Sequence, residues 1–314
     1  MISAKARGFG KVILFGEHFV VFGQPGIASG IDKYVEVEIA KVKDSTDVTF
    51  DDKVFKEKVS MKENPENIKC KMLNAMFKDE QFVKLEGLKI TINSNLPNGA
   101  GLGYSAAIAV AIARAMNQLF DLLWKDEQIN ETAHKSEQIV HGTPSGIDTA
   151  CATYDSVIWF EKGNKEKKDS VRRLKCGKAL QFLLVDTGIK HASKEALGVV
   201  KKYETASKKK FDIMCSDYKK LAGKAKQELQ YGGVNELGKL MNENHSMLKE
   251  LGLSTKEIDE IVKVAIYDGA LGAKITGAGM GGNVLILCYN EAQQDKLITA
   301  YAGRNYKAMK VKIS

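Results

Sequence analysis

One glycine-rich segment constrains the fold of this chain more than any other stretch. Residues 97–107 read Pro-Asn-Gly-Ala-Gly-Leu-Gly-Tyr-Ser-Ala-Ala, with alternating glycines at Gly99, Gly101 and Gly103. Because glycine has no Cβ, the backbone N–H groups of such a loop can close around a bulky anion. The segment therefore indicates a phosphate cradle, with an ordinary tight turn as the alternative.

The flanking sequences place this loop between a strand and a helix. Residues 88–92 alternate apolar and polar side chains, which is typical of a half-buried strand. Residues 108–120 are rich in Ala, Ile, Val and Met, and Ser105 stands where an N-cap residue is expected. A helix N-terminus would direct unpaired N–H groups and its positive dipole end at the loop. The loop matches neither a Walker A motif nor a dinucleotide-binding fingerprint, because the lysine and the third helix glycine of those motifs are missing.

Length and composition bound the class of protein. The 314 residues suffice for two domains, and fractions of 44% apolar and 27% charged residues are ordinary for a globular protein. We expect neither a leader peptide nor a membrane span, because no apolar run is long enough. Five scattered cysteines without a CxxC pair favour the reducing cytoplasm over a disulfide framework or structural zinc. The net charge of +8 rests mostly on lysines of expected turns and helix faces, so we expect no nucleic-acid partner.

Periodicity predicts that strands and helices alternate along the chain, which is typical of an α/β or α+β fold. Strands are predicted over residues 11–15, 20–22, 31–40, 88–92, 180–185 and 283–289, with a hairpin and a loop within 44–66. Helices are predicted over residues 67–77, 108–120, 126–140, 194–230, 235–251, 256–267 and 292–301. A lysine-rich connection over residues 161–179 is the best boundary between two halves, which we place at 1–172 and 173–314.

Two further segments carry candidate chemistry. Residues 275–282, Ile-Thr-Gly-Ala-Gly-Met-Gly-Gly, form a second glycine-rich run, and two such loops favour a shared phosphate site over two unrelated turns. Residues 141–148, His-Gly-Thr-Pro-Ser-Gly-Ile-Asp, predict a rigid turned loop that ends at Asp148. An aspartate held in this way can orient or deprotonate an attacking hydroxyl, as phosphoryl transfer requires. Its alternative role is a helix cap.

Three isolated residues are also candidates for a site. Glu137, on the helix before that loop, is a candidate magnesium ligand, because Mg²⁺ needs only one or two carboxylates beside phosphate oxygens. Lys11 can stabilise negative charge that develops on a reacting hydroxyl. Exposure to solvent is the alternative for both residues, and a hydrogen-bonded core position is the alternative for His18.

Together these segments resemble the GHMP kinase superfamily of galactokinases and of homoserine, mevalonate and phosphomevalonate kinases. Three ordered motifs carry the resemblance, namely residues 10–23, 97–107 and 275–282. Residues 141–148, with weaker support from 186–188 and 240–248, bring it closest to the mevalonate kinases. The resemblance spans almost the whole chain. It implies a two-lobed α+β fold, with a ribosomal-protein-like N-terminal α/β lobe, a ferredoxin-like C-terminal lobe and the site between them.

The resemblance also implies an activity. It is ATP-dependent phosphorylation of the 5-hydroxyl of mevalonate in isoprenoid biosynthesis, with ATP and mevalonate as partners and Mg²⁺ as cofactor. Asp148 would be the catalytic base or hydroxyl orienter, Lys11 would stabilise charge in the transition state, and Ser105 and Glu137 would bind Mg²⁺. The residues that would bind the ATP phosphates are Pro97, Gly99, Ala100, Gly101, Leu102, Gly103, Tyr104 and Ser105. The residues that would bind mevalonate are Glu17, His18, Thr187, Gly277 and Gly279.

Three sites depart from the family pattern, and one of them is Ala192-Ser193, which stands where a Ser-Thr pair is usual. Tyr104 replaces the first of a usual pair of serines and leaves Ser105 as its only aliphatic hydroxyl. Met280 interrupts a run that is commonly all glycine. Another acceptor, such as phosphomevalonate or a sugar, and a non-catalytic nucleotide-binding relative are therefore the alternative functions. The resemblance leaves a homodimer open.

Overall fold

The computed structural model describes residues 2–97, 101–142, 144–163, 169–189 and 193–313. The chain divides into two compact units, and residues 12–31, near the N-terminus, belong to the second unit. The first unit comprises Met1–Lys11 and Asp32–Asp155, and the second comprises Val12–Ile31 and Ser156–Ser314. Each unit is therefore built from two stretches of chain. The division into halves at residues 172 and 173 stays a prediction.

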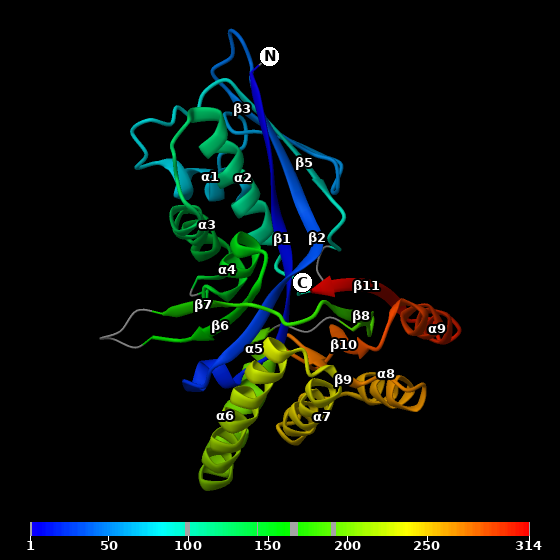
Figure 1. The fold of residues 1–314 in the computed structure, drawn as a ribbon. Helices are drawn as coiled ribbons and strands as arrows, with labels where there is room; N and C mark the ends of the chain where they lie inside the picture. The colour runs from blue at the N-terminus through cyan, green and yellow to red at the C-terminus, as the bar shows by residue number, and fades with distance from the viewer. Residues whose placement is uncertain (1, 98–100, 143, 164–168, 190–192, 314) are drawn as a thin grey trace. The chain divides into compact units, whose positions relative to one another are not determined.

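Strands and helices alternate in both units, which confirms the predicted α+β fold (Figure 1). The strands are β1 (Ser3–Phe15), β2 (Gly26–Lys41), β3 (Val48–Asp52), β4 (Glu57–Ser60), β5 (Leu88–Ser94), β6 (Val157–Glu161), β7 (Ser170–Leu174), β8 (Leu180–Asp186), β9 (Gly272–Thr276), β10 (Asn283–Cys288) and β11 (Lys307–Ile313). The helices are the 3-10 helix η1 (Phe19–Phe22) and α1 (Ile68–Phe77), α2 (Tyr104–Phe120), α3 (Asp126–His141), α4 (Ile147–Tyr154), α5 (Ser193–Ala206), α6 (Lys208–Tyr231), α7 (Val234–Glu250), α8 (Lys256–Tyr267) and α9 (Glu291–Ala302).

The first unit packs helices against one face of a sheet. Its strands follow the order β4, β3, β5 and β2, and β1 also pairs with β2. The antiparallel register of β2 and β5 sets Val37 opposite Ile92 and Ile39 opposite Ile90, and all four side chains are buried. Such apolar cross-strand pairs stabilise the sheet through contact and burial. Helices α1, α2 and α3 lie on one side of these strands (Figure 1).

Helix α2 occupies the centre of the first unit because its side chains are small. It packs against α3 and α4. Its buried alanines are Ala106, Ala107, Ala109, Ala111, Ala113 and Ala115. They allow neighbouring backbone to approach closely, and Gly8 on β1 lies directly against the Ala107 carbonyl. Strand β1 and helix α2 are thus in contact without intervening side chains at this point.

The second unit contains a four-stranded antiparallel sheet in the order β11, β8, β10 and β9. In chain order it reads strand, helices, strand, strand, helix and strand, which is the ferredoxin-like arrangement expected from the sequence. Helices α7 and α8 pack on β9, and α9 packs on β8 and β11. In the same unit the first residues of β2 pair with β6, and β6 pairs with β7.

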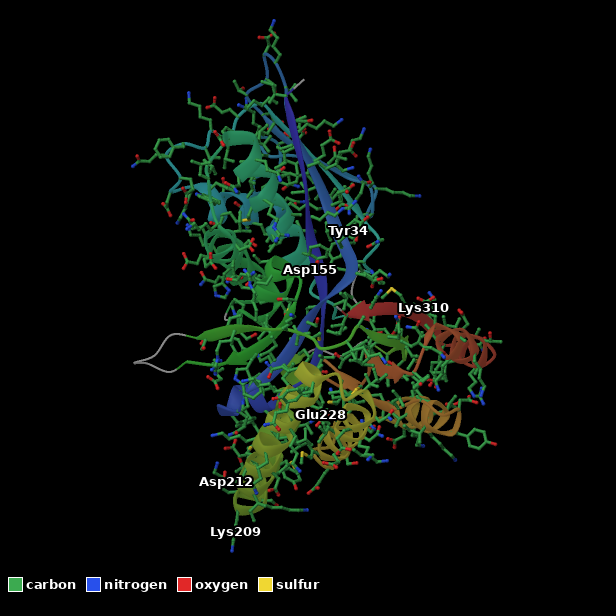
Figure 2. All side chains as sticks on the ribbon, in the orientation of Figure 1. Tyr34, Asp155, Lys209, Asp212, Glu228 and Lys310 are labelled. Carbon is green, nitrogen blue, oxygen red and sulfur yellow. The ribbon has the colours of Figure 1, made fainter. Side chains whose placement is uncertain are left out.

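Charged side chains lie on the helices and the edge strand of the second unit. Lys209 and Asp212 are exposed on α6, and Lys310 lies on the edge strand β11 (Figure 2). Lysines on an edge strand discourage pairing with another chain. Among the residues that the structure describes, no helix is both long and apolar enough to cross a bilayer.

Local structure departs from the sequence prediction in three connecting regions. Residues 20–22 belong to η1 rather than to a strand, because Gly16, His18 and Gly23 all adopt positive φ and close a tight turn. The single helix predicted over 194–230 divides into α5 and α6 at Ser207, whose φ of −143° is extended. The lysine-rich connection contains a strand, β7, which pairs with β6.

Four further short elements were not predicted, and one cap was predicted wrongly. The missed elements, besides β7, are α4, β6, β9 and β11. Ser105 is not the N-cap of α2. The helix begins one residue earlier, at Tyr104, and Gly103 with a φ of 73° is its N-cap. Ser105 is consequently the second helical residue.

We expect Gly8→Ala to destabilise the protein by about 1–3 kcal/mol, as overpacking of a core does. A Cβ on Gly8 would lie 2.1 Å from the carbonyl oxygen of Ala107, and backbone atoms of packed elements cannot move aside freely. Urea unfolding measures the change in the free energy of unfolding. Gly223→Ala, inside α6 with no heavy atom within 4 Å of the added Cβ, is the matched control and should be neutral or stabilising. Equal stability of the two variants would contradict the close approach of β1 and α2.

Candidate functional site

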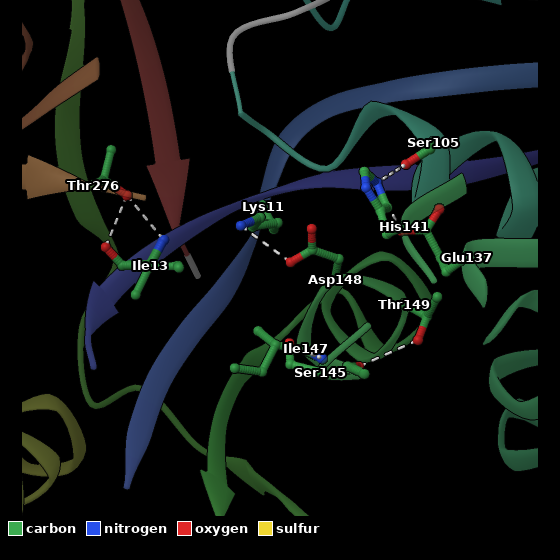
Figure 3. A network of polar contacts seen from close by, with 11 residues as sticks. Lys11, Ile13, Ser105, Glu137, His141, Ser145, Ile147, Asp148, Thr149 and Thr276 are labelled. Atoms are coloured by element: carbon green, nitrogen blue, oxygen red, sulfur yellow. Dashed lines mark hydrogen bonds and ion pairs between the residues drawn. The ribbon is translucent and has the colours of Figure 1, made fainter. Parts of the chain in front are cut away.

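A lysine on β1 and an aspartate on α4 form an ion pair in the first unit (Figure 3). Lys11 Nζ lies 3.1 Å from Asp148 Oδ1. The Lys11 side chain is 8% exposed, whereas 36% of the Asp148 side chain is exposed. A desolvated ammonium group beside a carboxylate that solvent or substrate can reach is suited to stabilising charge and accepting a proton. The structure therefore brings the two predicted catalytic residues together.

The turned loop predicted to end at Asp148 ends two residues earlier, at Gly146. Gly142 and Gly146 both adopt positive φ, and Gly146 is the N-cap of α4. Asp148 thus lies in the first turn of the helix and is not its cap. The positive end of the helix dipole favours a carboxylate at this place.

The first glycine loop closes against Lys11. The backbone N–H of Lys11 donates to Leu102 O at 2.9 Å. Gly101 and Gly103 have φ values of 70° and 73°, and a Cβ on Gly103 would lie 2.9 Å from Lys11 Cγ. Only glycine fits position 103, because both the backbone conformation and the contact exclude a side chain. Of the other predicted phosphate-binding residues, Pro97 is exposed, and residues 99 and 100 lie outside the described part of the chain.

A buried carboxylate lies at the start of α2. Glu137 on α3 is 1% exposed, and its Oε1 atom has no hydrogen-bond partner among the residues that the structure describes. His141 Nε2 lies 3.3 Å from Ser105 Oγ and 3.7 Å from Glu137 Oε2 (Figure 3). Burial raises the pKa of the Glu137 carboxyl. The Ser105 hydroxyl opposes this shift and the charge of Asp148 adds to it.

These groups fit a magnesium ion. A buried carboxylate oxygen without a partner, beside a hydroxyl, offers the hard oxygen donors that Mg²⁺ prefers. Within the described ranges, no group of three or more His, Cys, Asp or Glu side chains could hold a metal ion by itself. Phosphate oxygens and water would therefore have to complete the coordination.

Tyr104 packs into an aromatic contact of the first unit. Its ring meets that of Phe55 edge-on, with centroids 6.0 Å apart. Its hydroxyl oxygen is buried and finds no hydrogen-bond partner among the described residues. Burial raises the pKa of Tyr104, and the charge of Asp52 adds to the shift. The bulk of this tyrosine is thus accommodated against Phe55, which leaves Ser105 as the hydroxyl beside Glu137.

A fully buried ion pair lies in the second unit. Lys274 Nζ on β9 donates to Glu17 Oε1 and, at 2.6 Å, to Ile275 O. Neither charged side chain has any exposed surface. Burial lowers the pKa of Lys274, and the Glu17 carboxylate opposes that shift. The sequence did not identify Lys274, although a lysine within an otherwise uncharged strand beside a glycine loop is a readable signal.

Further contacts join residues 13–18 to the second glycine loop within the same unit. His18 Nε2 lies 2.7 Å from Ala278 O. Thr276 Oγ1 accepts from Ile13 N and donates to Ile13 O, both at 3.0 Å (Figure 3). His18 is thus a hydrogen-bonded, half-buried residue with a φ of 60°.

The second glycine loop is the hairpin between β9 and β10. Gly277 and Gly279 have φ values of 90° and 79°. Met280 adopts the same left-handed region with a φ of 59°, so the loop keeps a glycine-like conformation despite the substitution. Thr187 reaches this hairpin, because its hydroxyl and its N–H both donate to Gly282 O at 2.9 Å. The predicted substrate-binding residues therefore gather in the second unit.

Two family models match the chain. The model of the GHMP kinases N terminal domain matches residues 67–156, and that of the GHMP kinases C terminal matches residues 225–308. The mevalonate kinase of Pyrococcus furiosus is 36% identical over 313 residues, covering 93% of this chain and 91% of that protein. This chain belongs to the GHMP kinase family.

Solved structures of GHMP kinases agree with this membership. The crystal structure of L. major mevalonate kinase in complex with R-mevalonate has a TM-score of 0.86 and 30% identity, covering 99% of this chain and 95% of that one. The Methanococcus jannaschii mevalonate kinase also has a TM-score of 0.86, at 26% identity, covering 99% of this chain and 98% of that one. The family and the fold predicted from the sequence are confirmed.

We expect the stability of the protein to depend on pH through His245 on α7, which is influenced by the charge of Lys274 in the buried ion pair. His245 is 7% exposed, and within the described part of the chain its Nδ1 atom has no hydrogen-bond partner. Burial lowers its pKa to about 4, and the Lys274 charge adds to the shift. A histidine whose pKa is lower in the folded than in the unfolded state opposes folding once it can protonate. The unfolded chain binds a proton at His245 below pH 6.5, whereas the folded protein does so only near pH 4. The free energy of unfolding therefore falls as the pH falls from 6.5 to about 4.

We expect the parent to lose about 3 kcal/mol more stability than His245→Gln as the pH falls through this range, since one pKa unit corresponds to about 1.4 kcal/mol. Urea unfolding of both proteins at a series of pH values measures the difference. A stability difference between parent and variant that stays constant from pH 7 to pH 4 would rule out this role of His245.

Proposed function

We propose that this chain is an ATP-dependent mevalonate kinase, which transfers the γ-phosphate of ATP to the 5-hydroxyl of mevalonate in isoprenoid biosynthesis. One observation carries the proposal. The Lys11–Asp148 ion pair lies against a glycine loop at a helix N-terminus, in a chain whose relatives reported above are mevalonate kinases. Those relatives do not favour phosphomevalonate, a sugar or a non-catalytic role.

We assign the two residues of the ion pair complementary roles. The exposed carboxylate of Asp148 accepts the proton of the acceptor hydroxyl, or orients that hydroxyl for attack. Lys11 Nζ, 3.1 Å from this carboxylate, stabilises the negative charge that develops on the attacking oxygen. Phosphoryl transfer requires mainly positioning and charge stabilisation from a protein, and this pair supplies both.

We assign the phosphates of ATP to the first glycine loop. The positive φ of Gly101 and Gly103 and the N-terminus of α2 support this assignment, because they leave backbone N–H groups open to an anion. The other residues proposed for the phosphate site are Pro97, Gly99, Ala100, Leu102, Tyr104 and Ser105. Ser105 and Glu137 would hold Mg²⁺, and the partnerless Oε1 of Glu137 supports this role. When bound, Mg²⁺ neutralises the charge of the phosphate oxygens.

We assign mevalonate binding to residues of the second unit, namely Glu17, His18, Thr187, Gly277 and Gly279. Their contacts with the second glycine loop support a common role. Lys274 neutralises Glu17, so a substrate carboxylate would not meet an unpaired negative charge there. We also propose residues 1–172 and 173–314 as the two family lobes, since the family models match on either side of this boundary. The cytoplasmic location and the homodimer stay predictions.

A panel of acceptors tests the proposed function directly. With ATP and Mg²⁺, mevalonate should give the highest kcat/KM among mevalonate, phosphomevalonate, galactose and homoserine. Steady-state assays of ADP release measure each value. A higher kcat/KM for any other acceptor would overturn the assignment of mevalonate.

We expect Asp148→Asn to lower kcat by at least about 10²-fold, which is the size of a general-base contribution. ATP binding, measured by calorimetry, should remain within about twofold, because the phosphate loop is intact. Asp217→Asn is the matched control, since Asp217 is an exposed α6 residue paired only with Lys220 in the described contacts. Parent-like turnover of Asp148→Asn would exclude Asp148 as the base.

A further inference from the structure

One arginine contacts the backbone or side chains of three elements around α2. Arg114 lies on α2 and its side chain is 22% exposed. Its Nη1 donates to Arg7 O on β1 at 2.8 Å, and its Nη2 donates to Thr153 O on α4. The same Nη2 lies 3.6 Å from Asp126 Oδ1 in the first turn of α3.

The four elements joined in this way are those that carry the proposed catalytic and metal-binding residues. Lys11 lies on β1, Ser105 on α2, Glu137 on α3 and Asp148 on α4. Arg114 itself lies on α2, and its guanidinium group contacts the other three elements, β1, α3 and α4.

The contacts of Arg114 lie away from the reacting groups. Arg7 precedes Lys11 by four residues on a strand, and Thr153 follows Asp148 by five residues on a helix. At about 3.3 Å per strand residue and about 1.5 Å per helix residue, these offsets amount to about 7–13 Å. Arg114 therefore acts through the elements and not on a substrate at Lys11 and Asp148.

The chemistry of the guanidinium group suits this task. Its donors form a rigid planar fork, so two hydrogen bonds fix the directions of both partner elements, which a single ammonium group cannot do. Thr153 O belongs to the last turn of α4, where a cation is favoured by the negative end of the helix dipole. The charge of the same arginine also acts on Asp155, which ends α4.

We propose that Arg114 is a positioning residue, which fixes β1, α3 and α4 relative to α2 and thereby sets the spacing of Lys11 and Asp148 and that of Ser105 and Glu137. The proposal rests on the proposed function for the reaction that this spacing serves. Because a misplacement of about 1 Å at a reacting group costs up to about 10²-fold in rate, loosening of these elements should be seen in turnover.

Arg114→Met tests the proposal, because methionine keeps an unbranched stem and removes the guanidinium. We expect kcat to fall at least about tenfold. We also expect the KM values for ATP and mevalonate to stay within about threefold, because the groups that bind them are retained. Arg304→Met is the matched control. Arg304 likewise donates to a carbonyl in the last turn of a helix, Ala300 O at 2.8 Å, and lies 4.0 Å from a carboxylate, that of Glu260. Its kcat should equal that of the parent.

Hydrogen exchange without substrate provides a readout that does not depend on the reaction. Amides of β1 and α4 should exchange faster in Arg114→Met than in Arg304→Met. Arg114→Lys keeps the charge but cannot form the fork, so it should give the same changes to a smaller degree. This variant decides the matter if Arg114→Met does not fold.

Two results would overturn the proposal. One is parent-like exchange in β1 and α4 of the Arg114 variants. The other is a loss of kcat that disappears after correction for the unfolded fraction, measured by thermal denaturation, since it would make Arg114 a residue of stability alone. A parent that phosphorylates no acceptor would refute the proposed function, whereas the exchange experiment would still test the coupling of the elements.

Discussion

The first unit is organised around Lys11, whose ammonium group is buried and has lost most of its hydration. Removing an ammonium group from solvent costs several kcal/mol unless a counter-charge and fixed dipoles replace the lost hydration. Asp148 supplies the charge, and the first turn of α4 presents that carboxylate. Gly103 leaves room for the lysine stem, and Leu102 anchors its backbone. Loop, strand and helix thus have one common requirement, which is to surround the amine of Lys11.

The second unit also contains a buried lysine, Lys274, which is less exposed than Lys11. Lys274 has no exposed surface. Glu17 balances its charge, and the Ile275 carbonyl accepts a hydrogen bond from its ammonium group. Both lysines lie on strands next to glycine loops, but Asp148 keeps contact with solvent whereas Glu17 does not. Asp148 can therefore exchange protons with a bound molecule. The enclosed pair joins the segment before η1 to β9, beside the second glycine loop.

The sequence predicts those features that depend on local chemistry. Helix α8 begins and ends at the predicted residues 256 and 267, because Thr255 caps it and its apolar period is regular. Features that depend on distant partners are not predicted in this way. Ser207 is the N-cap of α6, but its side chain makes no capping hydrogen bond, and the flanking residues suit a helix. Three apolar residues at 20–22 fit a 3-10 turn as well as a strand.

The same distinction applies to the site. Lys11 and Asp148 were identifiable because each lies in a motif, and Glu137 because it lies on the helix just before residues 141–148. Lys274 and Arg114 were missed, since their partners lie 257 residues and 107 residues away in the chain. Sequence motifs record which groups are present at a turn or a helix end. They do not record which carbonyl a long side chain will reach after folding.

Residues 12–31 belong to the second unit although they lie between two stretches of the first, and this limits how the protein can be divided. A cut after Asp155 would leave this segment on the N-terminal fragment, while β6, which pairs with Gly26–Ser29, would go to the other. Ile27 and Phe19, both buried in the intact chain, would lose their covering. Neither unit is therefore a continuous gene segment. Separate production of the first unit would require a short linker that joins Lys11 directly to Asp32 and omits residues 12–31.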